Sequence, residues 1–144
     1  MGSVSYENVG PVAVVTVDNA PVNALSQAIR RGLSEAFARF KSDDTADIAV
    51  IVGAGRMFIG GADISEFGKP PQSPSLPDVI SQIEACDKPV VAAIHGMALG
   101  GGLEVALGAH YRIALPGTRV DGHDFAATAI ELGASLVCKV LNTR

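Results

Sequence analysis

The feature that most constrains this chain is a run of three glycines, residues 100–102, set between two apolar segments. The first segment, residues 90–94, has the length and β-branching of a strand buried on both faces. The second, residues 103–109, has helical length. Glycines at a helix start let backbone N–H groups approach a ligand, and the first N–H groups lack intrahelical partners at the positive end of the helix dipole. Such a loop suits an oxygen that becomes negative during a reaction.

Glu104 lies just inside the first turn of the predicted helix, close to the same glycines. A loop rich in free N–H groups beside a carboxylate indicates a catalytic site. A purely structural interpretation stands beside it, because a glycine run often makes only a tight turn and a first-turn glutamate often only complements the dipole. This stretch alone leaves both interpretations open.

The rest of the chain alternates between strand and helix patterns. Strands are predicted over residues 4–9, 11–17, 47–53, 90–94 and 111–115, and helices over residues 26–41, 78–86 and 103–109. This order predicts an α/β fold built from right-handed crossovers.

Two loops and the C-terminal residues complete the pattern. Residues 53–62 form a glycine-rich loop, followed by a short turn at residues 63–67. Four prolines lie within residues 70–77, which predicts a mobile surface loop rather than a helix or central strand. From Asp124 to Val140, apolar residues recur at three- and four-residue intervals, which predicts a helix with Asp124 as its N-cap.

Composition excludes several functions. With 144 residues, 48% hydrophobic and 18% charged, the chain is one globular domain's worth of sequence. A net charge of −4 argues against a nucleic-acid partner and supplies no basic patch for a membrane. Neither a signal peptide nor a membrane-spanning run is visible, so we expect a soluble, cytoplasmic protein. The three histidines and two cysteines show no metal spacing, and His95 is expected to be a packed, hydrogen-bonded residue.

Two motifs resemble the signatures of a known family. GRMFIGGADISEF, residues 55–67, and HGMALGGGLEVALGAHYRIA, residues 95–114, are similar in content and order to the two signatures of the crotonase, or enoyl-CoA hydratase/isomerase, superfamily. The segment GLEVALGAHYRIA, residues 102–114, is especially similar to the N-terminal hydratase part of multifunctional fatty-acid β-oxidation enzymes. The resemblance runs from about residue 6 to residue 118, and the chain resembles such a domain truncated after about residue 119.

The resemblance implies a fold and its division. The family's spiral of ββα turns would be incomplete, with residues 1–119 as the N-terminal half, a crotonase-like acyl-CoA-binding core. Residues 120–144 would form a divergent helical tail.

The resemblance also implies a site. The family's oxyanion hole falls on the backbone N–H groups of Ala62 and Gly101, and the first of two catalytic glutamates falls on Glu104. The second glutamate normally follows in a Pro-Glu pair, which this chain lacks, and Glu131 is the only acidic residue after Asp124. The substrate-binding positions implied are Gly60, Gly61, Ala62, Asp63, Ile64, Gly100 and Gly101.

The implied function is that of an enoyl-CoA hydratase, a lyase that adds water syn to a 2-enoyl-CoA in fatty-acid β-oxidation. An acyl-CoA thioester would be the partner, with coenzyme A as part of the substrate, no separate cofactor and no metal, and the protein would be a homo-oligomer. The missing second glutamate predicts impaired activity. Two alternatives stay open: another family reaction, enoyl-CoA isomerisation or decarboxylation, or a non-catalytic fragment that binds CoA.

Overall fold

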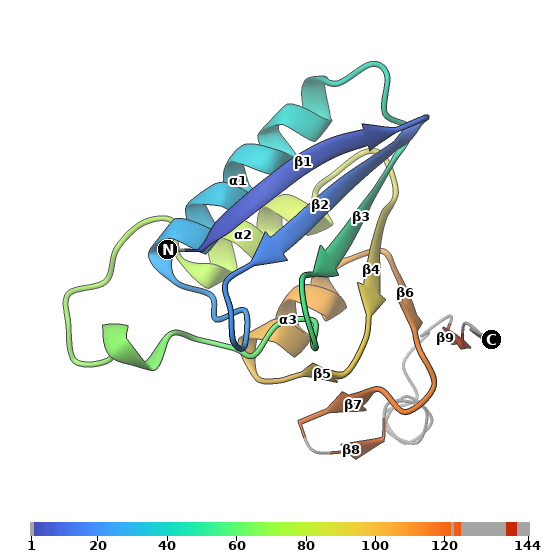
Figure 1. Ribbon diagram of the computed structural model, residues 1–144. Coiled ribbons are helices and arrows are strands. Elements are labelled where there is room, and N and C mark those ends of the chain that lie inside the picture. The colour runs from blue at the N-terminus through green and yellow to red at the C-terminus, as the bar shows by residue number, and fades with distance from the viewer. Residues whose placement is uncertain (1, 122, 125–137, 141–144) are drawn as a thin grey trace.

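The fold is built on one six-stranded sheet with helices against one of its faces (Figure 1). The computed structural model describes residues 2–121, 123–124 and 138–140. Its elements are β1 (Ser3–Val9), β2 (Val12–Asp18), α1 (Gln27–Ser42), β3 (Ile48–Gly53), the 3-10 turn η1 (Ile64–Glu66), α2 (Leu76–Glu84), β4 (Val90–Ile94), β5 (Met97–Ala98), α3 (Gly101–Gly108), β6 (Tyr111–Ala114), β7 (Arg119–Val120), β8 (His123–Asp124) and β9 (Cys138–Val140).

The strand order of the large sheet is β1-β2-β3-β4-β6-β9. β1 and β2 form an antiparallel hairpin, and every later neighbour pairs in parallel. Parallel strands need crossover connections, and α1, α2 and α3 supply them between β2 and β3, β3 and β4, and β4 and β6. The α/β architecture expected from the sequence is therefore confirmed.

The core lies between the helices and the alternate residues of the strands that face them. Ala13, Val15 and Val17 of β2 are buried, while the residues between them are half-buried. On α1, the buried residues include Ile29, Leu33, Phe37 and Phe40, the face that helical spacing predicts. Ser26 caps this helix by accepting a hydrogen bond from the Ile29 N–H, 3.3 Å from Oγ.

Helix α2 begins two residues before its predicted start. Ser75 and Asp78 form a capping box, in which each side chain accepts a hydrogen bond from the other residue's backbone N–H. Leu76 and Pro77 therefore occupy the first turn, where proline lacks an N–H that would have no intrahelical partner in any case. The expectation that residues 70–77 exclude helix was wrong at its last two positions.

A second sheet has the order β5-β7-β8 and joins the ends of the β4 and β6 segments. Its strands are two residues long, too short to leave a pattern in the sequence.

The prediction of a helix from Asp124 to Val140 was wrong at both ends of that range, where the structure has strands. Asp124 lies in β8, opposite Arg119 of β7, and Cys138–Val140 forms β9 beside β6. A parallel strand at that position hydrogen bonds to the edge of β6, a long-range pairing that helical spacing does not reveal. The residues between, 125–137, lie outside the described part of the chain, as does Glu131.

Candidate active site

Two glycine-rich segments leave neighbouring strands at the same edge of the sheet. β3 and β4 pair in parallel, so residues 53–62 and residues 95–102 emerge side by side. The Phe58 N–H donates to the carbonyls of His95 and Met97, at 3.0 and 3.1 Å, and the Leu99 N–H donates to Ile59 at 3.1 Å. Ile59 and Ala98 form a parallel bridge. The two signature motifs are thus in contact through the residues that lie between each strand and its candidate catalytic residue.

The Ala62 and Gly101 amides lie next to each other at the end of this pairing. A Cβ placed on Gly101 would be 3.8 Å from the Ala62 nitrogen, and one on Gly61 would be 3.7 Å from the Gly101 nitrogen. Among the hydrogen bonds that join described residues, neither amide N–H has an acceptor. Two adjacent donors without an acceptor are what an anionic oxygen requires.

Glycine is needed in this arrangement for two different reasons. Gly61 has a φ of +99°, a backbone conformation that side chains disfavour. Gly102 packs so closely on Ile59 that a Cβ there would collide with the Ile59 carbonyl. The first turn of α3 therefore sits directly against the first motif.

The loop before α3 is held by an aspartate that the sequence analysis did not single out. Gly100, the N-cap, has a φ of +48°, and its N–H donates to Oδ1 of Asp121 at 2.6 Å. The Asp121 N–H in turn donates to the Ala98 carbonyl at 3.0 Å. Asp121 lies just after β7, a strand too short to predict, so no local pattern points to it.

Glu104 lies in the first turn of α3 and is exposed. Its backbone N–H bonds to the Gly100 carbonyl at 3.1 Å, while its carboxylate makes no hydrogen bond or ion pair with any described residue. The side chain can therefore meet a ligand or water without first breaking an internal contact. Glu131, the candidate for a second carboxylate, lies outside the described residues.

Asp63, one of the implied substrate-binding positions, caps the turn η1 with its side chain. Its Oδ1 accepts hydrogen bonds from the Ser65 N–H at 3.0 Å and the Ser65 hydroxyl at 2.7 Å, at the start of η1. These bonds hold the pKa of the carboxyl below its usual value. Ile64 beside it is 77% exposed, which leaves a large apolar side chain in solvent two residues after Ala62.

The histidines with described side chains have hydrogen-bond partners in the fold. Nε2 of His95 lies 2.8 Å from the Gly55 carbonyl and so links the end of β4 to the first glycine-rich segment. Nδ1 of His110 accepts from the Val90 N–H at 3.0 Å. The expectation of a hydrogen-bonded His95 is confirmed.

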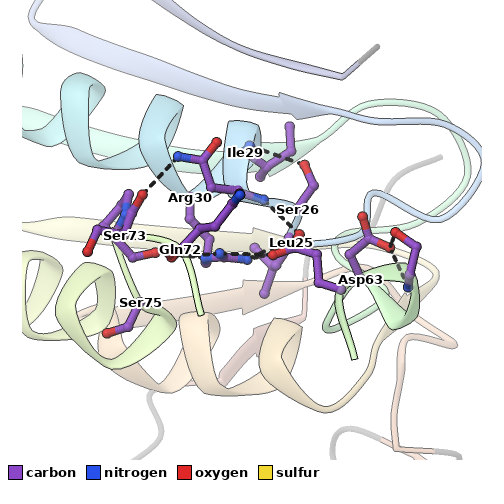
Figure 2. Close-up of polar contacts among 12 residues, drawn as sticks. Leu25, Ser26, Ile29, Arg30, Asp63, Gln72, Ser73 and Ser75 are labelled. Atoms are coloured by element: carbon purple, nitrogen blue, oxygen red, sulfur yellow. Dashed lines mark hydrogen bonds and ion pairs between the residues drawn. The ribbon is translucent and has the colours of Figure 1, made fainter. Parts of the chain in front are cut away.

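The proline-containing loop is fastened to α1 rather than free of contacts. Gln27 donates to the Ser73 carbonyl at 2.8 Å, and Arg30 donates to the carbonyls of Pro74 at 2.8 Å and Gln72 at 3.1 Å. Figure 2 shows Arg30 between this loop and Leu25. The mobility expected for residues 70–77 stays a prediction, but the backbone of the loop has defined anchors.

A cavity of about 480 Å³ lies at the other end of the sheet, among residues that precede β3 and β4. Phe37, Phe40 and Gln82 help to line it, together with the half-buried Cys86, and burial raises the pKa of that thiol. None of the residues assigned to the acyl-CoA site lines this cavity.

The sequence profile of the enoyl-CoA hydratase/isomerase family matches residues 7–137. This range continues beyond residue 118, where the motif resemblance was expected to end. Among the described residues, no helix is long and apolar enough to cross a membrane.

Curated relatives and solved structures agree with the profile. The chain is 52% identical over 103 residues to the peroxisomal bifunctional enzyme of Danio rerio, covering 72% of this chain and 14% of that protein. It is 44% identical over 110 residues to a probable enoyl-CoA hydratase of Bacillus subtilis, covering 72% and 43%. A solved enoyl-CoA hydratase/isomerase family member superposes with a TM-score of 0.77 at 27% identity over 100% of this chain and 55% of that one. The chain thus spans less than two thirds of each of these proteins.

Proposed function

The chain belongs to the enoyl-CoA hydratase/isomerase family, and on that premise we propose that it binds a 2-enoyl-CoA thioester for hydration. Homologues with hydratase names support the crotonase-type reaction. The observation that carries the proposal is the adjacent pair of amides, Ala62 and Gly101, neither of which has an acceptor among the described residues.

In this proposal the thioester oxygen accepts both N–H groups. Addition of water to the β-carbon pushes electrons onto that oxygen, and the enolate that forms is then protonated at the α-carbon. Backbone donors fixed before the reaction stabilise this charge, each by on the order of 3 kcal/mol. The N-terminal end of α3 adds its dipole to the same oxygen. Gly60, Gly61, Asp63, Ile64 and Gly100 would line the substrate around it.

Glu104 is assigned the acid/base role. Its carboxylate is exposed, has no partner among the described residues, and follows Gly101 within the same helical turn. Hydration by the family's route uses a second carboxylate, and the sequence has no Pro-Glu pair to supply it. Loss of a general acid/base lowers a rate by about 10²- to 10⁴-fold. We therefore propose that this chain binds acyl-CoA weakly and hydrates enoyl-CoA poorly or not at all.

The test follows the conjugated-thioester absorbance of crotonyl-CoA with this chain and with Glu104→Gln and Glu131→Gln. We expect slow or absent turnover, further reduced by Glu104→Gln and unchanged by Glu131→Gln. Turnover near that of a full-length hydratase, abolished by Glu131→Gln, would contradict the proposal and identify Glu131 as the second carboxylate.

A second function is favoured by the missing Pro-Glu pair: a CoA-binding protein without catalysis. A binding isotherm for CoA, measured beside the hydration assay, separates the two, because binding without any turnover favours the second. Isomerisation or decarboxylation within the same family would appear as turnover of a 3-enoyl-CoA or a carboxyacyl-CoA in place of crotonyl-CoA.

Partners and location are further proposals. No separate cofactor or metal is assigned, since coenzyme A arrives as part of the substrate, and we propose a homo-oligomer. The Danio rerio relative is named peroxisomal, whereas the sequence-based expectation for this chain was cytoplasmic. Fractionation of cells that express the tagged chain would decide between these two locations.

A further inference from the structure

Arg30 connects three segments that surround the candidate oxyanion hole (Figure 2). Its side chain, on α1, is only 11% exposed. Nη1 donates to the Leu25 carbonyl at 2.8 Å, and Nη2 lies 3.1 Å from Oε1 of Glu66. Nε and Nη2 also donate to the carbonyls of Pro74 and Gln72, at 2.8 and 3.1 Å. One guanidinium therefore joins the segment that precedes α1, the turn η1 and the proline-containing loop.

Each of these segments leads directly to one of the two amides. Leu25 forms a parallel bridge with Ala62, and its N–H donates to the Gly61 carbonyl at 2.7 Å. Glu66 ends η1, which begins two residues after Ala62. Its Oε2 also accepts the Gln27 N–H at 2.9 Å, so Glu66 is tied to α1 at two points.

The other amide is bordered by the same segments. The Leu25 and Leu76 side chains are the atoms nearest to a Cβ placed on Gly101, at 3.1 and 2.8 Å. Leu76 opens α2 two residues after Pro74, whose carbonyl Arg30 holds. Arg30 therefore binds segments whose residues border both Ala62 and Gly101.

We propose that Arg30 is a positioning residue for the oxyanion hole, holding the Ala62 segment at the distance from Gly101 at which both N–H groups reach one oxygen. The inference rests on the proposed function of the two amides. Only arginine supplies five N–H donors in a rigid plane, so one side chain can bond to four acceptors on three segments. A lysine keeps the charge but not this geometry.

The experiment measures two quantities for each variant. The first is the affinity for CoA, and the second is the enolate signal, the near-ultraviolet absorbance of the enolate that bound acetoacetyl-CoA forms. CoA binding does not depend on the thioester oxygen, whereas the enolate signal reports how well the two amides stabilise it. The variants are Arg30→Met, Arg30→Lys and Glu66→Gln. Arg31→Met is the matched control, because Arg31 is the next residue on α1, is exposed, and makes no side-chain hydrogen bond or ion pair with the described residues.

We expect Arg30→Met and Arg30→Lys to lower the enolate signal by about tenfold or more, since small displacements of oriented groups have large effects. CoA affinity should stay within about twofold, and Arg31→Met should match the unaltered chain. Equal losses of CoA affinity and of the enolate signal would show a merely structural role. An enolate signal in Arg30→Lys equal to that of the unaltered chain would show that charge alone matters. Either result overturns the proposal, as does an unchanged signal.

A failure of the proposed oxyanion hole can be distinguished from a failure of the role proposed for Arg30. If the unaltered chain binds CoA but shows no enolate signal, the oxyanion hole itself is wrong and the role of Arg30 falls with it. If Arg30→Met does not fold, Arg30→Lys and Glu66→Gln decide, each verified by circular dichroism. An enolate signal equal to that of the unaltered chain in both would overturn the proposal.

Discussion

At Gly101 the backbone N–H and the missing side chain have separate consequences. The N–H is the first of α3 and has no acceptor among described residues, whereas the space beside Cα is limited by Leu25 and Leu76. An alanine would bring its Cβ to 2.8 Å from Cδ2 of Leu76, the end of a side chain that can move. Steric and hydrogen-bonding effects can therefore be tested by different substitutions.

Gly101→Pro removes the N–H, while Gly101→Ala adds a Cβ and keeps it. Proline is tolerated at the first position of a helix, so both variants should fold. We expect the proline variant to lose on the order of 3 kcal/mol of enolate stabilisation relative to the alanine variant, as for other lost oxyanion donors. The measurement is the acetoacetyl-CoA enolate signal, with CoA affinity as the control. Equal signals in the two variants would remove Gly101 from the oxyanion hole.

At the scale of elements, the C-terminal end of α1 is held by hydrogen bonds from two other segments. Asp43, the C-cap, accepts hydrogen bonds from the Tyr6 hydroxyl at 2.6 Å and from Asn8 Nδ2 at 3.0 Å, both on β1. Lys88, just before β4, donates from Nζ to the carbonyls of Phe40, Asp43 and Ala46, at 2.6, 2.9 and 2.9 Å. These contacts hold the end of α1 and the segment after it against β1 and against the residues just before β4.

Asp43 should make stability depend on pH. Hydrogen bonds from Thr45, then Tyr6 and Asn8, hold the pKa of this carboxyl well below its usual 3.8. Because the folded state favours the charged form, the stabilisation is present above pH 3.8 and is lost as the pH falls further. We expect the urea midpoint to fall below that pH, and the fall to be smaller in Asp43→Asn. Asp44→Asn, at an exposed neighbour, is the control, and an identical acid dependence in all three chains would contradict the assignment.

For the whole molecule, the sheet has two unlike faces. The helices cover one face, and no helix of the described residues lies on the other (Figure 1). Val14, Val50 and Val91 are register partners across β2, β3 and β4 and are half-buried on that second face. A hollow of about 220 Å³ continues it, lined by residues such as Ala93 and Ile113. An apolar row of this kind favours association.

We expect the chain to self-associate through this second face. Val14→Thr with Val50→Thr keeps the β-branched shape while adding hydroxyls, and it should shift light-scattering masses towards the monomer. Val9→Thr, at an exposed position at the end of β1, should leave the mass unchanged. A monomer at all concentrations in the unaltered chain, or equal masses in all three, would contradict the expectation.

The sequence by itself determined the elements whose signals are local. The β-branched, largely apolar run of β2, the helical spacing on α1 and the glycines before α3 each depend on neighbours within a few residues, and the structure confirms all three elements. The family resemblance of the two motifs implied Ala62 and Gly101 as a pair, and the parallel pairing of β3 with β4 brings their segments to one edge of the sheet. Their roles as donors to a substrate stay predictions.

Only the tertiary structure decided which residues support that pair. Arg30 meets Glu66 and Pro74 from 36 and 44 positions away, and Asp121 meets Gly100 from 21. A helix-surface arginine and a turn aspartate look like solvated residues in the sequence, since nothing local marks their partners. Strands β5, β7, β8 and β9 escaped prediction for the same reason: each is two or three residues long and exists only because another segment offers it backbone hydrogen bonds.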